Sequence, residues 1–83
     1  MGRTLTVRQP TSRQLHWLEV WLEDEHPAQV QRRALAILYY GLGLDGRAIA
    51  RALQVHPNTI YADLHAFADD GLACLHTLSL IHI

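Results

Sequence analysis

DGRAIARALQVHPNTIYADL, residues 45–64, is the stretch that decides the fold. It contains two short helical patterns separated by a three-residue break. Asp45 can cap a helix over residues 46–53, and Pro57 suits the first turn of a helix that we expect to end at residue 67 or 68. Two short helices joined by such a break predict a helix-turn-helix.

The two helices of this motif have to cross steeply and share one core. Ala50 is small enough to lie at the crossing, and Val55 can close the turn. The expected core positions are Ile49, Leu53, Val55, Ile60, Leu64 and Phe67. The positions expected on or near the exposed face of the second helix are Asn58, Thr59, Tyr61, Ala62 and His65.

Two further helical patterns precede this stretch. Thr11 or Ser12 offers a hydroxyl cap for a helix that we expect to run to Glu25, with Leu15, Leu18, Trp21 and Leu22 at helical spacing. The next helix is expected to begin at Pro27, and Gly41 and Gly43, which tolerate a positive φ, are expected to end it. Its expected inward residues are Val30, Ala34, Leu35, Ile37, Leu38 and Tyr39, and Arg32 and Arg33 are expected on its polar side. No strand alternation of useful length occurs, so we predict an all-α fold.

Residues 28–75 resemble the homeodomain-like helix-turn-helix domain at the N-terminus of bacterial insertion-sequence transposases of the mariner-like DDE class. The matching residues are Arg33-Ala34, Ile37-Leu38, Gly43-Leu44, Ile49-Ala50, Leu53, Val55, Thr59-Ile60-Tyr61, Leu64, Phe67, Gly71-Leu72 and Leu75. The resemblance implies a four-helix homeodomain-like domain that binds double-stranded DNA sequence-specifically at transposon ends. The parent transposases carry a metal-dependent catalytic domain, for which these 83 residues have no room. We therefore expect a fragment that is not itself an enzyme.

The resemblance and the expected geometry together suggest roles for eight residues. The side chains expected to face the major groove, where Asn pairs with adenine and Ala touches a thymine methyl, are Asn58, Tyr61, Ala62 and His65. The side chains expected to meet backbone oxygens are Arg47, Arg51, His56 and Thr59. Two alternatives stay open. In the first, Tyr61 packs its ring against the helix that is expected to begin at Pro27. In the second, Arg47 and Arg51 form a solvated, salt-bridged face.

Three residues depart from the pattern of the resembling family. Ala48 stands where an acid is usual, so the reciprocal capping box with Asp45 is lost. Gln54 stands where a turn glycine is common, which implies either a strained positive φ or a different turn. His56 replaces the usual serine cap of the second helix and is a weaker cap, whose ring could instead reach a phosphate.

The distribution of charge limits how strongly the chain can bind a polyanion. The formal net charge is -1, and all seven basic residues are arginines, at positions 3, 8, 13, 32, 33, 47 and 51. From residue 52 onward the fixed charges are Asp63, Asp69 and Asp70. Because phosphate binding needs a basic face, we expect weak DNA affinity. We also expect Asp63 to lie on a solvated face of its helix and to repel phosphate.

The chain divides into three parts in this interpretation. Residues 1–10 are expected to be a flexible basic arm, in which Arg3 and Arg8 either enter a minor groove or stay disordered. Residues 11–77 form the helix-turn-helix domain. Residues 78–83 match the in-frame translation of CTGTCTCTTATACACATC, an adapter used in transposase-based sequencing libraries, and are interpreted as an artefact.

Composition excludes several other classes of function. The single cysteine, Cys74, is expected to be a half-buried small apolar residue, and the six histidines do not pair at metal-binding spacing. We expect no cofactor, no metal and no nucleophile-base pairing. No apolar run is long enough to cross a bilayer, which predicts a cytoplasmic protein without a membrane partner.

Two rival functions stay open. The first is the DNA-binding domain of a transcription regulator. The second is a protein-interaction or dimerisation module, which the acidic C-terminal half favours and which exposure of Trp17 and Tyr40 would also favour. A homodimer of the full-length protein is compatible with either DNA-binding hypothesis.

Overall fold

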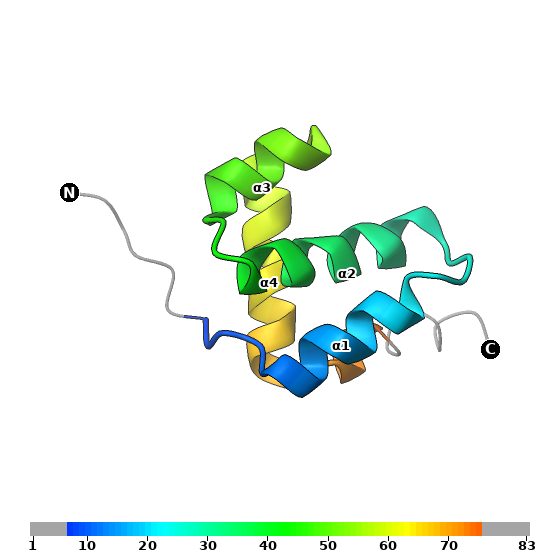
Figure 1. Ribbon diagram of the computed structural model, residues 1–83. Helices are drawn as coiled ribbons and strands as arrows, with labels where there is room; N and C mark the ends of the chain where they lie inside the picture. Colours follow the sequence, from blue (N-terminus) through cyan, green and yellow to red (C-terminus); the bar gives the residue numbers. More distant parts are fainter. Residues whose placement is uncertain (1–6, 76–83) are drawn as a thin grey trace.

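The computed structural model describes residues 7–75 and contains four α-helices in this range. They are α1 (Ser12–Trp21), α2 (Ala28–Gly41), α3 (Gly46–Leu53) and α4 (Pro57–Asp70). Figure 1 shows α1 alongside α2, and α4 running across both of them with α3 packed at its amino end. The expected all-α class with four helices is confirmed.

Local signals place the helix boundaries. Thr11 forms a capping box with Gln14 at the start of α1, and Asp45 accepts a hydrogen bond of 2.8 Å from the Ala48 amide at the start of α3. Both caps satisfy amides that have no partner within the helix. The predicted bounds of α3 are confirmed, whereas α4 continues to Asp70 before Gly71, at φ 62°, ends it.

The first helix ends at Trp21 and not at the expected Glu25. His26 explains the difference, because its Nε2 atom lies 2.7 Å from the Trp21 carbonyl oxygen and its ring stacks on the Trp21 ring. This side chain satisfies a carbonyl that a continuing helix would otherwise bond. The chain then turns, and α2 begins at Ala28 with Pro27 as its cap.

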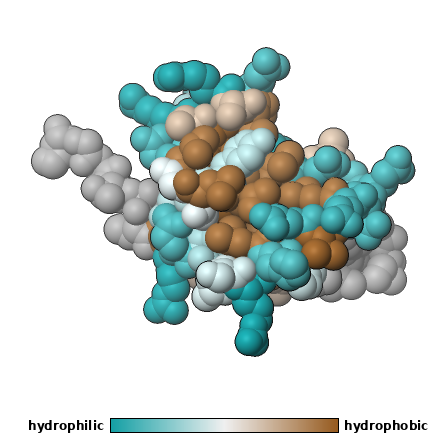
Figure 2. All heavy atoms as spheres, viewed as in Figure 1, coloured by the Kyte–Doolittle hydropathy of each residue, from teal (hydrophilic) through white to brown (hydrophobic). Residues whose placement is uncertain are grey.

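The core lies where α2, α3 and α4 meet. Its expected members Ile49, Ile60, Leu64 and Phe67 are buried, whereas Leu53 and Val55 are only partly buried. Sequence reasoning missed other buried residues, namely Val7, Ala36, Tyr40 and Leu75, and Cys74 is fully rather than half buried. Some apolar side chains also gather on the face shown in Figure 2. Leu35 and Leu53 line an open groove between α2 and α3.

The expected flexible arm is packed over the part that the structure describes. Val7 and Pro10 are buried, and the Tyr40 hydroxyl donates a hydrogen bond to the Val7 carbonyl. A Cβ at Gly41 would lie 2.8 Å from Pro10 Cγ, so the absence of a side chain there lets the arm approach α2 closely. The remainder of the arm, residues 1–6, and the supposed adapter residues 78–83 lie outside the described residues.

Candidate nucleic-acid interface

One face of α4 is open to solvent along the whole helix. Asn58, Ala62 and His65 are exposed at helical spacing, and the same stripe continues to Asp69. The buried residues of α4 lie on the other side of the helix, and they are Ile60, Asp63, Leu64 and Phe67. The core therefore holds α4 by one face and leaves the opposite face free to contact another molecule.

The amino end of α4 is capped by a histidine ring. The Asn58 amide donates to His56 Nδ1 over 3.0 Å, and Pro57 occupies the first turn. A ring nitrogen that accepts a hydrogen bond carries no proton, so in this geometry the imidazole proton sits on Nε2. His56 is exposed and Thr59 is half-buried beside it. The ring thus serves as the cap that its position predicts, and its exposure keeps it accessible.

The turn between α3 and α4 resolves the alternatives raised by Gln54. This residue adopts φ 60° and ψ 45°, the left-handed conformation, and no other non-glycine residue among those described has a positive φ. The Val55 amide bonds the Ala50 carbonyl over 3.0 Å, which is the six-to-one bond of a Schellman motif. The family-like turn is therefore kept, with a glutamine at the position where glycine has no steric cost.

The Tyr61 ring packs on the amino end of α3. A Cβ built at Gly46 would lie 2.2 Å from Tyr61 Cε1, so the ring occupies the space that any side chain at this position would need. Tyr61 is half-buried and Gly46 is buried as a result. This close approach sets how α3 lies against α4.

Arg47 and Arg51 extend from α3 into solvent one turn apart. Within residues 7–75 neither of them forms an ion pair with a carboxylate, since the ion pairs found there both involve Asp63. The alternative of a salt-bridged face therefore lacks its acidic partners in the described part of the chain. Two exposed guanidinium groups without an ion pair, on the helix that packs against α4, favour contact with an anion.

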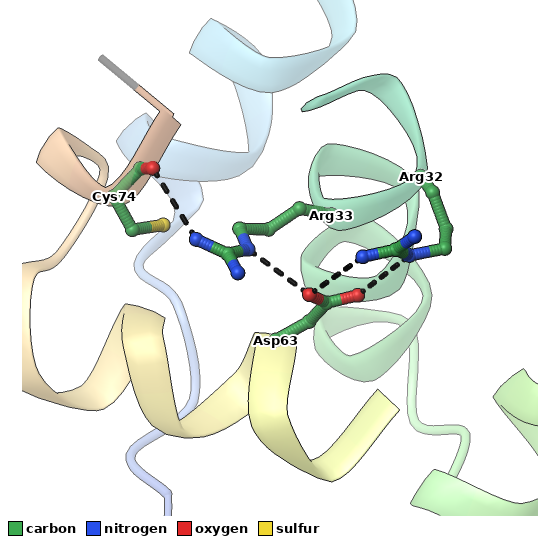
Figure 3. Close-up of polar contacts among 4 residues, drawn as sticks. All are labelled: Arg32, Arg33, Asp63 and Cys74. Atoms are coloured by element: carbon green, nitrogen blue, oxygen red, sulfur yellow. Dashed lines mark hydrogen bonds and ion pairs between the residues drawn. The ribbon is translucent and has the colours of Figure 1, made fainter. Parts of the chain in front are cut away.

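The largest difference between the sequence interpretation and the structure concerns Asp63. Its side chain is 1% exposed and accepts hydrogen bonds from Arg32 Nε and Arg32 Nη2, at 3.0 and 3.1 Å, and from Arg33 Nε at 3.0 Å (Figure 3). Arg33 also donates to the Cys74 carbonyl over 3.5 Å. The prediction of a solvated, phosphate-repelling Asp63 is wrong, and so is the placement of Arg32 and Arg33 on a merely polar face.

A signal for this cluster was present in the sequence. Asp63 lies three residues after Ile60 and four before Phe67, which is within the inward stripe of α4. A charge at an inward position needs a partner of opposite charge, and Arg32 and Arg33 interrupt the inward stripe of α2 in the same way. Only the fold shows that these three side chains face one another.

A metal site, a reactive thiol and a membrane-spanning helix are each absent or unfavourable in the described part of the chain. Among residues 7–75 no group of three or more His, Cys, Asp and Glu side chains lies close enough to hold a metal ion. Burial raises the pKa of the Cys74 thiol, with a smaller opposing effect from Arg33. None of the described helices is both long enough and apolar enough to span a bilayer.

Comparison with known proteins gives one match. Residues 27–75 match the model of a family described as a homeodomain-like domain. This segment includes α2, α3 and α4, and with them all eight residues of the candidate interface. No curated protein and no solved structure matches the chain.

Proposed function

Because this chain belongs to the homeodomain-like helix-turn-helix family, we propose that it reads the sequence of duplex DNA with the exposed face of α4. A domain of this family indicates DNA binding. The finer proposal is that the DNA is a transposon end and that the chain is the recognition module of a transposase. It is supported by the resemblance of residues 28–75 to the corresponding transposase domains.

The observation that carries the proposal is the exposed face of α4, together with two exposed arginines on α3, the helix packed against it. Asn58, Ala62 and His65 are exposed where a recognition helix contacts base edges, and Arg47 and Arg51 are exposed on the adjoining helix. An α-helix fits the major groove, whose base edges offer partners to an amide and a methyl to an alanine. In this proposal the side chains that touch bases are Asn58, Tyr61, Ala62 and His65.

Contacts to the DNA backbone complete the proposed interface. They are assigned to Arg47 and Arg51, which are exposed on α3, and to His56 and Thr59, which lie at the amino end of α4. The helix amino end favours an anion because its amides and its dipole are positive there. With Arg32 and Arg33 bound to Asp63, the fully exposed arginines within residues 7–75 are Arg8, Arg13, Arg47 and Arg51. This small number predicts modest affinity that falls steeply with salt.

Selection from a library of random duplexes, followed by fluorescence anisotropy, tests the proposal. We expect the chain to enrich one sequence and to bind it more tightly than a scrambled duplex, with affinity that decreases as salt increases. Asn58→Ala is expected to weaken binding to the enriched duplex and to leave the affinity for the scrambled duplex unchanged. Failure to enrich any sequence, or an affinity independent of salt, would contradict sequence-specific binding.

The transposase proposal needs its own comparison of DNA probes. Duplexes from the terminal repeats that flank a mobile element encoding this chain should bind more tightly than duplexes from neighbouring promoters. The reverse order would favour a transcription regulator. One of the two grounds for a dimerisation module, the exposure of aromatic residues, is not met, because Tyr40 is buried and Trp17 is half-buried and stacked on Trp21.

A further inference from the structure

The cluster of Asp63 with Arg32 and Arg33 joins two helices by directional contacts. Figure 3 shows the Asp63 carboxylate between the two guanidinium groups, so the arginines hold it from two directions. Arg32 binds it through two nitrogen atoms and Arg33 through a third. Such paired hydrogen bonds to a charged acceptor depend strongly on the angle at which the groups meet.

The other inward side chains of α4 make no hydrogen bonds of this angle-dependent kind. Ile60, Leu64 and Phe67 contact the core through apolar groups, and burial of apolar surface is favourable in many orientations. A buried ion pair is poor evidence for stability by itself, because well-packed apolar side chains often do as well. What the cluster adds to this face is a preferred rotation of α4 about its axis.

We propose that Asp63 is a positioning residue for DNA readout, which sets through Arg32 and Arg33 the rotation of α4 and hence the side chains that reach base edges. This inference rests on the proposed function. Asn58, Ala62 and His65 lie on the side of α4 away from the cluster, so any rotation moves them directly. At about 5–6 Å from the axis, a rotation of about 20° moves a side-chain tip by about 2 Å, which is more than a base contact tolerates.

The cluster also balances the negative charge of Asp63 within the helix that carries the proposed interface. A lone carboxylate on a helix that enters the major groove repels phosphate, whereas two guanidinium groups more than balance it here. Replacing Asp63 by asparagine therefore has two opposite consequences. It raises the net charge by one, which favours all DNA, and it releases the rotation of α4, which disfavours only the correct sequence.

The experiment compares Asp63→Asn with Asp24→Asn, a matched change of charge at an exposed position after α1. Both are titrated against the duplex enriched by the wild type and against a scrambled duplex. We expect Asp63→Asn to lower the ratio of specific to non-specific affinity about tenfold, as the loss of one base contact does. Binding to scrambled DNA should stay equal or increase. An unchanged ratio in the folded variant overturns the proposal.

Two further variants keep the test decisive if Asp63→Asn does not fold. Arg32→Gln removes the two-atom contact and leaves Arg33 paired, and Asp63→Glu keeps the charge but displaces it by one methylene. Both should lower the same ratio, by smaller factors than Asp63→Asn. If both fold and both keep the wild-type ratio, Asp63 has no positioning role.

A DNA-free measurement separates this inference from the proposed function. Residual dipolar couplings report the orientation of α4 relative to α2 in the free protein. The couplings should differ between the wild type and Arg32→Gln, but not between the wild type and Asp24→Asn. If no duplex is enriched, the proposed function fails. If the α4 orientation is equal in all of these variants, the positioning inference fails, whatever the DNA result.

Discussion

Helix α4 is held by an ion-pair cluster on one side and by close packing on the other. On the α2 side, Arg32 and Arg33 hold the buried carboxylate of Asp63. On the α3 side, Tyr61 lies on Gly46 with no room for a Cβ, while Arg47 and Arg51 of α3 point into solvent. Two arginine pairs in one small domain thus have different roles, since only the α2 pair faces an acid. A count of basic residues therefore overstates the charge available to DNA.

The largest effect is expected when the ion-pair cluster between α2 and α4 loses its carboxylate. Asp63→Ala leaves two partly buried guanidinium groups without their carboxylate, and loss of one partner of a buried ion pair costs about 3–5 kcal/mol. Chemical denaturation followed by circular dichroism measures the free energy of unfolding. Asp24→Ala, at an exposed position, should change it by less than about 0.5 kcal/mol. Equal effects of the two variants would show that the cluster does not hold α4.

The second prediction concerns the close packing of the Tyr61 ring on Gly46, at the contact between α3 and α4. Gly46→Ala places a methyl group against the Tyr61 ring, and we expect overpacking to lower the free energy of unfolding by about 1–3 kcal/mol. In a Tyr61→Ala background the methyl group has space, so the same substitution should cost much less. A double-mutant cycle measures this coupling. Additive effects of the two substitutions would mean that the ring does not set the α3–α4 packing.

The third prediction separates the two arginine pairs. Replacing both Arg47 and Arg51 by glutamine should change the free energy of unfolding by less than about 0.5 kcal/mol, because both side chains are exposed. The slope of log affinity against log salt should fall by about two, at roughly one per lost phosphate contact. Arg13→Gln, exposed on α1, serves as the control for the loss of one charge. A slope that Arg13→Gln lowers as much as each α3 substitution would assign the effect to net charge alone.

The smallest expected effect concerns the turn that joins α3 to α4. Gln54→Gly relieves a left-handed conformation that costs most residues about 1–2 kcal/mol, against about 0.5–1 kcal/mol of added chain entropy in the unfolded state. We expect a net gain of about 0.5–1 kcal/mol, seen as a higher Tm. Gln54→Ala should give no gain, because alanine has the same steric conflict as glutamine. Equal Tm values for the glycine and alanine variants would contradict backbone strain at this turn.

Several features followed from local sequence signals. The bounds of α3 and the cap at Asp45 were expected from residues within one or two turns of each other, and the positive φ of Gln54 was one of two alternatives left open. The exposure of Asn58, Ala62 and His65 agrees with the helical period of the core positions around them. Their roles toward DNA stay predictions. Helix ends that depend on another segment were less accurate, as the histidine-capped end of α1 shows.

The amino-acid sequence by itself determined the number of helices, the turn between α3 and α4 and the pattern of the core, because caps, breakers and helical periodicity act over a few residues. Only the tertiary structure decided which charged residues are paired. Asp63 and Arg32 are 31 residues apart, and the helical period places each of them on an inward stripe without showing that the two side chains face one another. Packing of α2 against α4 excludes water from the space between them, and in that space a carboxylate and two guanidinium groups are stable only together.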